Sequence, residues 1–87
     1  MGVEVLPRVH ERHPQLTDED VRTAWESAIL SAPRIGRDRD EYVALGFDAK
    51  GRLVEMAAVR MSVSRWVIFH ATTPPSEKTL RELGVER

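Results

Sequence analysis

Residues 41–71 place the strongest limit on what this chain can fold into, because they form three apolar runs separated by short polar connections. The runs are residues 41–47, 52–60 and 65–71. The first connection, residues 48–51, ends in Gly51, and four residues closing on glycine are typical of a type I turn that relaxes through a left-handed residue. The pattern predicts a three-stranded antiparallel meander whose last strand ends near His70.

A helix is predicted ahead of this meander. Thr17 can cap the first free amides, and Asp20, three residues on, can reach back as in a capping box. Apolar residues then recur at the spacing of one helical face: Val21, Ala24, Trp25, Ala28 and Ile29. Pro33 disfavours helical geometry at the residue before it. We therefore expect one main helix from Asp18 to Ser31, packed on a face of the sheet through Trp25.

Shorter elements are expected at both ends of the chain. Residues 3–6 suit an edge strand, while Pro7 could open a short helix through His13, and both alternatives stay open. Ser76 can cap a last short helix over residues 77–83, with Gly84 at its end. We expect a single domain over residues 1–87, of the α+β class, with an antiparallel sheet of three or four strands.

Alternation along the strands assigns side chains to the two faces of the sheet. On the third run, Val67 and Phe69 are expected on one face and His70 on the other. Glu55 interrupts the apolar middle run. We expect it to pair across the sheet with a base such as Arg65, or to lie on a wetter face.

Composition narrows the functional classes. The chain has no cysteine, which excludes disulfides and thiolate chemistry and agrees with a reducing compartment. No stretch approaches the roughly 20 apolar residues that cross a bilayer, and no signal segment precedes the domain, so we expect a cytoplasmic protein with no membrane partner. The net charge is −1, so an anionic ligand would have to meet a local basic patch.

Histidines and cations are the candidates for chemistry. The three histidines complete no metal-binding motif, so we expect neither a metal nor another cofactor. What remains is a set of dispersed groups: Arg12, His13, Lys50, Arg60, Arg65, His70, Lys78 and Arg81. Such groups can hold a phosphodiester while a histidine exchanges the proton of a ribose 2′-hydroxyl. The plainer interpretation is that the cations are solvated and that His70 is a hydrogen-bonded, partly buried side chain.

The order of several short segments resembles the BrnT group of toxins. The segments are residues 11–21, 32–33, 40–47, 51–56 and 68–71, followed by a basic C-terminal helix. The resemblance covers residues 11–83. It implies a RelE-like fold and a ribonuclease of a bacterial type II toxin–antitoxin pair, silenced by a small cognate antitoxin protein. The family's basic-histidine pair corresponds to Arg12 and His13, and its polar or basic position at the end of the last strand corresponds to His70 and Ala71.

Two functional hypotheses follow. The first is a BrnT-like endoribonuclease that cleaves single-stranded RNA without metal, through attack of a 2′-hydroxyl. Its catalytic residues would be His70, His13 and Arg12, and its RNA-binding residues Lys50, Arg60, Arg65, Lys78 and Arg81. The second is a non-catalytic interaction module of the same fold that binds a protein partner or forms a homodimer. It is motivated by Ala71, which stands where family members commonly carry arginine, and by strands that are apolar on both faces.

Overall fold

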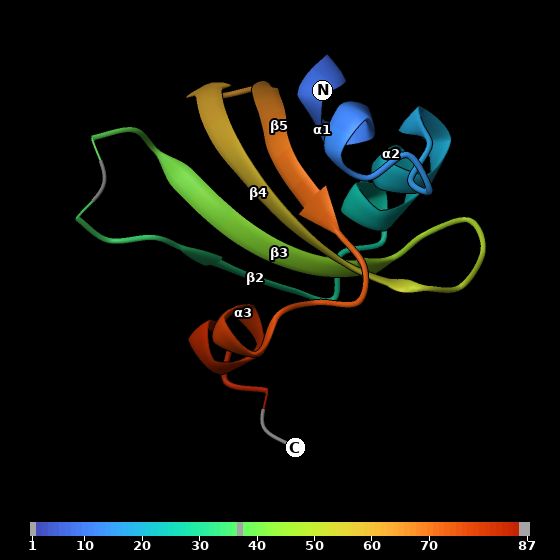
Figure 1. The fold of residues 1–87 in the computed structure, drawn as a ribbon. Coiled ribbons are helices and arrows are strands. Elements are labelled where there is room, and N and C mark those ends of the chain that lie inside the picture. The colour runs from blue at the N-terminus through green and yellow to red at the C-terminus, as the bar shows by residue number, and fades with distance from the viewer. Residues whose placement is uncertain (1, 37, 86–87) are drawn as a thin grey trace.

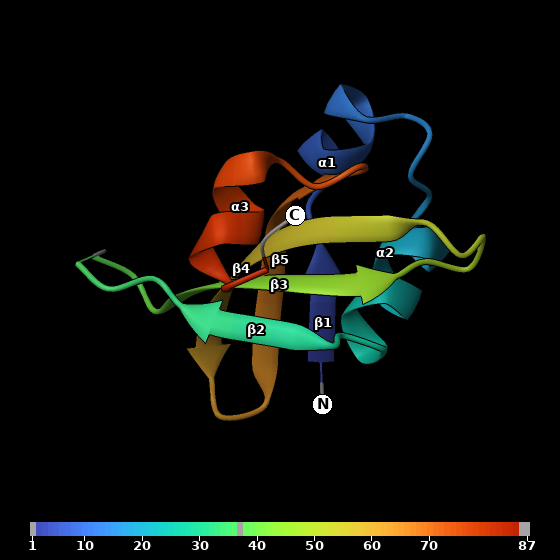
Figure 2. The ribbon, with the colours of Figure 1, turned by 90° about the horizontal axis from the view of Figure 1, so that it is seen from below.

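A mixed sheet of five strands lies at the centre of the computed structural model, which describes residues 2–36 and 38–85 (Figures 1 and 2). In sequence order the strands are β1 (Gly2–Val5), β2 (Leu30–Pro33), β3 (Glu41–Phe47), β4 (Leu53–Ser62) and β5 (Arg65–Thr72). Their spatial order is β1-β5-β4-β3-β2, with β1 parallel to β5 and all other neighbours antiparallel. The helices are α1 (Pro7–Arg12), α2 (Asp18–Glu26) and α3 (Glu77–Glu82).

The predicted meander is confirmed as β3, β4 and β5. Gly51 has a φ of 79° and closes the turn between β3 and β4, as its position at the end of that turn predicted. The sheet is nevertheless wider than the three or four antiparallel strands expected, because β1 and β2 add one strand to each edge and β1 adds a parallel pair. The α+β class holds, while the predicted strand number and the purely antiparallel pairing were wrong.

The main helix is shorter than predicted, and its early end leaves residues 30–33 free to form the strand β2. The helix α2 ends at Glu26 rather than at Ser31. The hydroxyl of Ser27 then donates to the carbonyl of Phe47 at 3.0 Å, which holds the chain against the end of β3. Pro33, taken as the signal for the helix end, instead closes an edge strand, where a missing amide proton costs little.

Both alternatives left open for the N-terminus are realised in turn. Gly2–Val5 forms β1 beside the first half of β5, and α1 begins directly afterwards with Pro7 in its first turn. Proline suits that position because its fixed φ is helical and the first amides of a helix have no intrahelical partner. Since β1 stops at Val5, α1 and not a strand lies along the last part of β5.

One face of the sheet is covered by α1 and α2. The predicted capping box is confirmed, because the Thr17 hydroxyl accepts from the Asp20 amide and the Asp20 carboxylate accepts from the Thr17 amide, each at 3.1 Å. Gly46 lets α2 approach β3 closely, since a Cβ at this position would lie 1.9 Å from the carbonyl oxygen of Ala24. The core beneath the helices consists of Val5, Val9, Leu16, Val21, Ala24, Ala44, Val54, Met56, Ala58, Ile68 and Ala71.

The C-terminal helix α3 lies against the opposite face (Figure 1). Ser76 caps it by accepting from the Thr79 amide, as predicted, and Gly84 follows it with a φ of 75°. Thr79 is fully buried against the sheet. No helix in the described part of the chain is long and apolar enough to cross a membrane.

A bulge in β5 changes which face His70 occupies. Ala58 pairs with Ile68 while its neighbour Ala57 pairs with His70, so Phe69 is an extra residue in the ladder. Because alternation is interrupted at Phe69, His70 lies on the α3 face and not on the face of Ile68. The predicted face of His70 was wrong for this reason, since strict alternation takes no account of an inserted residue.

Candidate functional site

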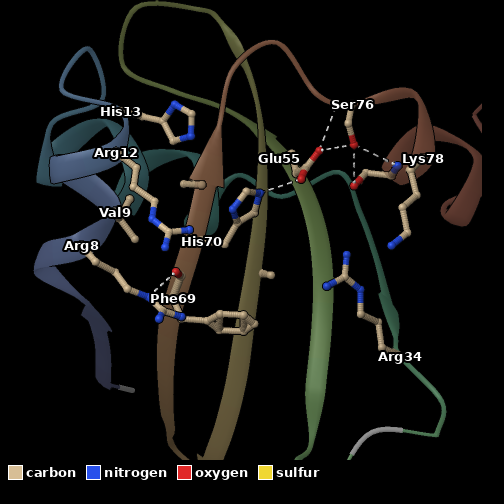
Figure 3. A pocket seen from close by; sticks show the side chains of 13 residues that line it. Arg8, Val9, Arg12, His13, Arg34, Glu55, Phe69, His70, Ser76 and Lys78 are labelled. Atoms are coloured by element: carbon tan, nitrogen blue, oxygen red, sulfur yellow. Dashed lines mark hydrogen bonds and ion pairs between the residues drawn. The ribbon is translucent and has the colours of Figure 1, made fainter.

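A cavity of about 320 Å³ opens between α1, the end of β5 and α3 (Figure 3). Its walls carry more positive than negative charge: the cations are Arg8, Arg12, Arg34 and Lys78, and the one carboxylate is Glu55. His13 and His70 complete the ionisable lining. The chain as a whole has a net charge of −1, so this excess of cations is local to the cavity.

His70 and Glu55 form the most tightly bonded pair in the cavity. Nε2 of His70 lies 2.7 Å from Oε2 of Glu55, and the other carboxylate oxygen accepts from both the amide and the hydroxyl of Ser76, at 2.9 and 3.0 Å. Burial by itself would raise the pKa of Glu55, but hydrogen bonds from His70, Ser76 and Thr79 outweigh it and lower the pKa to about 2. Glu55 is therefore a buried carboxylate that stays ionised at neutral pH.

An ionised Glu55 also determines the tautomer of His70. A carboxylate can only accept, so Nε2 of the imidazole must carry the proton of the shared hydrogen bond. In the neutral ring, Nδ1 is then unprotonated and able to accept a proton. The His70 side chain is 37% exposed, against 7% for Glu55, and Nδ1 lies on the side of the ring away from Glu55, where Arg12 and His13 line the cavity (Figure 3).

Arg12 and His13, both candidate site residues from the sequence, reach the same cavity from the end of α1. The rings of His13 and His70 meet edge to face, with centroids 6.5 Å apart and planes at 86°. Arg12, and likewise Lys78 on α3, makes no ion pair with any residue in 2–36 or 38–85, so two uncompensated cations face each other across the cavity. This arrangement suits an anion placed between α1 and α3.

Two further arginines line the cavity and were missed from the sequence. Arg8 donates from Nε to the carbonyl of Phe69 at 3.2 Å, next to the bulge. Arg34 forms a bidentate ion pair with Glu82 of α3, with hydrogen bonds of 3.1 and 3.2 Å. Nothing in a single sequence shows that the start of α1 and the segment after β2 contribute side chains to the same cavity. Their cationic character was the one available signal.

Four of the five predicted RNA-binding cations lie outside the cavity. Lys50 bonds to the buried carboxylate of Asp20 at 2.8 Å, Arg60 stacks over the ring of Trp66 at 5.9 Å, and Arg65 pairs with Glu4 at 3.1 Å. Each has a local partner that accounts for it. Arg81 is on α3 but does not line the cavity. The structure therefore brings together Arg12, His13, His70 and Lys78, and separates the other four cations from them.

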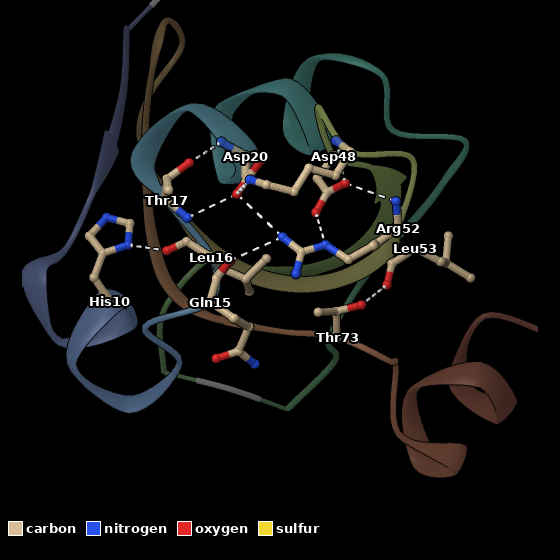
Figure 4. Close-up of polar contacts among 10 residues, drawn as sticks. His10, Gln15, Leu16, Thr17, Asp20, Asp48, Arg52, Leu53 and Thr73 are labelled. Carbon is tan, nitrogen blue, oxygen red and sulfur yellow. Dashed lines mark hydrogen bonds and ion pairs between the residues drawn. The ribbon is translucent and has the colours of Figure 1, made fainter.

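Lys50 belongs to a structural network that joins α2 to the turn between β3 and β4. Figure 4 shows three other members of this network, Asp20, Asp48 and Arg52. Arg52 bridges Asp48, at 2.7 Å, and Asp20, at 3.3 Å. The hydrogen bond from Lys50 lowers the pKa of Asp20 to about 2 against the opposing effect of burial. Burial alone would raise the pKa of Asp48, and its bonds with Arg52 lower it instead. These groups hold the fold and are not available to a ligand in the cavity.

The expected partner of Glu55 was also wrong. Arg65 pairs in register with Ser62, at the opposite end of the β4–β5 hairpin, whereas Glu55 pairs with Thr72 and lies diagonal to His70. The two-residue turn at 63–64 could have predicted the correct partner. Pairing residues outward from this turn along the two strands places Glu55 opposite the end of β5.

The cavity combines cations that can bind an anion with a histidine that can exchange a proton. Among residues 2–36 and 38–85, no group of three or more His, Cys, Asp or Glu side chains is placed to hold a metal ion. Comparisons with protein-family models, curated proteins and solved structures find no match to this chain. Function is therefore inferred from the geometry of the cavity and from the resemblance seen in the sequence.

Proposed function

We propose that this protein is a metal-independent endoribonuclease that cleaves single-stranded RNA, and that it acts as a cytoplasmic BrnT-like toxin of a bacterial type II toxin–antitoxin pair. The observation that carries the proposal is the convergence of His70, oriented by Glu55, with the cations Arg12 and Lys78 in one cavity. Helices packed on a mostly antiparallel sheet are compatible with the RelE-like fold that the resemblance implies. A small antitoxin protein would be its cognate partner.

The proposed reaction uses the chain's own groups. Nδ1 of His70 takes the proton of a ribose 2′-hydroxyl, and the 2′-oxygen attacks the adjacent phosphorus. The P–O5′ bond breaks and leaves a 2′,3′-cyclic phosphate, while the departing 5′-oxygen takes up a proton from His13 or from solvent and becomes a 5′-hydroxyl. Arg12 and Lys78 stabilise the negative charge that builds on the phosphorane oxygens. Glu55 holds the imidazole in the required tautomer and stabilises its protonated form.

Cleavage of RNA by the purified protein tests the proposal directly. Wild-type protein incubated with a single-stranded RNA is expected to produce fragments with cyclic phosphate ends, at equal rates with and without a chelator. His70→Ala should lose at least about 100-fold in rate, the lower end of what a positioned general base supplies. Arg65→Ala is the matched control, because it removes a cation outside the cavity. No cleavage by wild-type protein at any salt concentration would refute the proposal.

Growth of the producing cells gives a second test of the toxin assignment. Wild-type protein expressed without an antitoxin should arrest growth, and His70→Ala should be tolerated. Equal toxicity of the two proteins would remove His70 from the mechanism.

A non-catalytic interaction module that forms a homodimer is the second candidate, and one surface favours it. A groove of about 390 Å³ on the α2 side is lined by Trp25, Ala28, Ser31, Tyr42, Ala44 and Trp66, with no charged residue among them. Ile29, 58% exposed, and Leu30, 38% exposed, lie in the chain segment that borders it. A second copy could therefore supply apolar side chains to the groove while receiving the same contact in return.

The oligomeric state tests this second candidate. We expect a concentration-dependent dimer in analytical ultracentrifugation that Ile29→Asp dissociates. Ile35→Asp is the control, since Ile35 is 95% exposed but does not border this groove. A monomer at all concentrations would refute the homodimer.

A further inference from the structure

Phe69 is an aromatic side chain in a cavity whose other prominent groups are ionic. It is the extra residue of the β5 bulge, and it lines the cavity beside His70 (Figure 3). In a regular strand, two successive side chains would point to opposite faces. The bulge instead directs both the ring and the imidazole into one cavity, and re-aiming a side chain is a common role of such bulges near functional sites.

Two arginines from different elements hold this ring. The guanidinium carbon of Arg8, on α1, lies 5.7 Å from the ring centroid, and that of Arg39, in the β2–β3 connection, lies 4.9 Å from it. Arg8 also donates to the carbonyl of Phe69, and Arg39 is paired with Glu41 at 2.8 Å. The half-buried ring is thus fixed by contacts at its backbone and its π system, rather than by an apolar core.

The proposed proton transfer and phosphate binding give no role to an aromatic ring. Unpaired nucleobases, in contrast, are recognised chiefly by stacking on aromatic side chains and on guanidinium planes. Phe69 and His70 are adjacent in sequence, so their α-carbons are about 3.8 Å apart, a separation that fits a base and a ribose of the same nucleotide. The cavity of about 320 Å³ is at the small end of ligand sites and suits one nucleotide rather than a duplex.

We propose that Phe69, held by Arg8 and Arg39, is a base-stacking subsite for a nucleotide next to the phosphate that Arg12 and Lys78 bind. This inference rests on the proposed ribonuclease function and extends it to the choice of substrate. In this proposal the enzyme recognises an unpaired base by stacking the face of that base on the ring of Phe69. Cleavage therefore requires a base at that nucleotide but tolerates different bases.

An abasic substrate gives the direct test. The cleavage site in a short single-stranded RNA is first mapped, and each nucleotide flanking the scissile bond is then replaced in turn by an abasic ribonucleotide. We expect one of the two replacements to lower kcat/KM of the wild-type protein by about 10-fold, as the loss of one stacked base would. The ribose and phosphate are intact in these substrates, so the loss reports on the base alone.

Variants connect that effect to the ring. Phe69→Leu keeps apolar volume but removes the π face, and it should cleave the intact and abasic RNAs at the same reduced rate. Phe69→Trp should retain the preference for the intact RNA. Tyr42→Leu is the matched control, because it removes an aromatic ring that lines the groove on the α2 side. Thermal unfolding of each variant checks the fold. If Phe69→Leu does not fold, the wild-type and Phe69→Trp comparisons still decide the outcome.

The outcomes separate the two proposals. If wild-type protein cleaves RNA but treats intact and abasic substrates alike, the stacking subsite is refuted and the ribonuclease stands. If wild-type protein cleaves none of the RNAs, the ribonuclease proposal fails and the subsite fails with it. An undiminished preference for the intact RNA in Phe69→Leu would place the stacking surface elsewhere and overturn the assignment to Phe69.

Discussion

His70 and Glu55 face each other across β5 and β4, with Nε2 of the imidazole 2.7 Å from a carboxylate oxygen that is almost fully buried. The same carboxylate accepts two hydrogen bonds from Ser76 at the start of α3. Glu55 thus fixes the orientation of the imidazole and the position of the helix that carries Lys78. The bulge at Phe69 makes this possible, because it turns His70 to the face where α3 lies.

Replacing Glu55 with glutamine should weaken catalysis without unfolding the protein. The amide oxygen of Glu55→Gln can still accept one hydrogen bond, but it carries no charge to stabilise the protonated imidazole. We expect kcat for RNA cleavage to fall by about 10- to 100-fold. Nitrogen-15 NMR of the imidazole should show Nε2 protonated in the wild-type protein and a mixture of tautomers in the variant. An unchanged tautomer with unchanged kcat would show that Glu55 is purely structural.

Arg12 should contribute to RNA binding through charge alone. Arg12→Ala removes one cation from the cavity, so the affinity for a non-cleavable 2′-O-methyl RNA should fall and the slope of log K against log salt should decrease by about 1. The measurement is fluorescence anisotropy over a range of salt concentrations. Arg65→Ala, which removes a cation paired with Glu4, should leave the slope unchanged. Equal effects of the two substitutions would argue against a localised phosphate site.

Acid should destabilise the fold between about pH 5 and pH 2. The pKa of Asp20 falls from its ordinary 3.8 to about 2 in the folded chain, and that of Glu55 from 4.5 to about 2. The unfolded chain therefore takes up protons first as the pH falls, so the stabilisation is complete above the unfolded values and is lost as the pH approaches 2. Urea unfolding across this range measures the loss.

Asp20→Asn isolates one of these two contributions. It should lower the free energy of unfolding at pH 7 by roughly 2 kcal/mol, the equivalent of the pKa shift. It should also flatten the dependence on pH. Asp18→Asn is the control, since Asp18 is an exposed acid in the same helical turn. If the variant is as stable as the wild type, the ion pairs of Asp20 with Lys50 and Arg52 add nothing to the free energy of unfolding.

Gly46 should not tolerate even a methyl group. The Cβ of Gly46→Ala would lie 1.9 Å from the carbonyl oxygen of Ala24, a backbone atom that cannot move without shifting α2. We expect a loss of stability of about 1–3 kcal/mol, typical of an overpacked core. Thermal unfolding measures it. Gly2→Ala is the control, because its nearest contact would be an ordinary 3.8 Å.

The local elements could be predicted from the sequence because their signals are local. The capping box of Thr17 and Asp20, the turn at Gly51, the Ser76 cap and the three apolar runs depend on residues within a few positions of each other. Within the candidate site, Arg12, His13 and His70 could be named because titratable side chains at element ends are recognisable in any sequence. The structure brings these three side chains into one cavity.

The remaining features depended on contacts between distant parts of the chain. The strands β1 and β2 are short, and pairing with β5 and β3 defines them more than any pattern of their own. The partner of Glu55 depended on hairpin register and on one inserted residue, Phe69, which no periodicity indicates. The sequence by itself determined where α2 begins, the three strands of the β3–β5 meander and which residues carry ionisable groups. Only the tertiary structure decided which of those groups share a cavity, because side-chain direction follows from register and packing rather than from residue type.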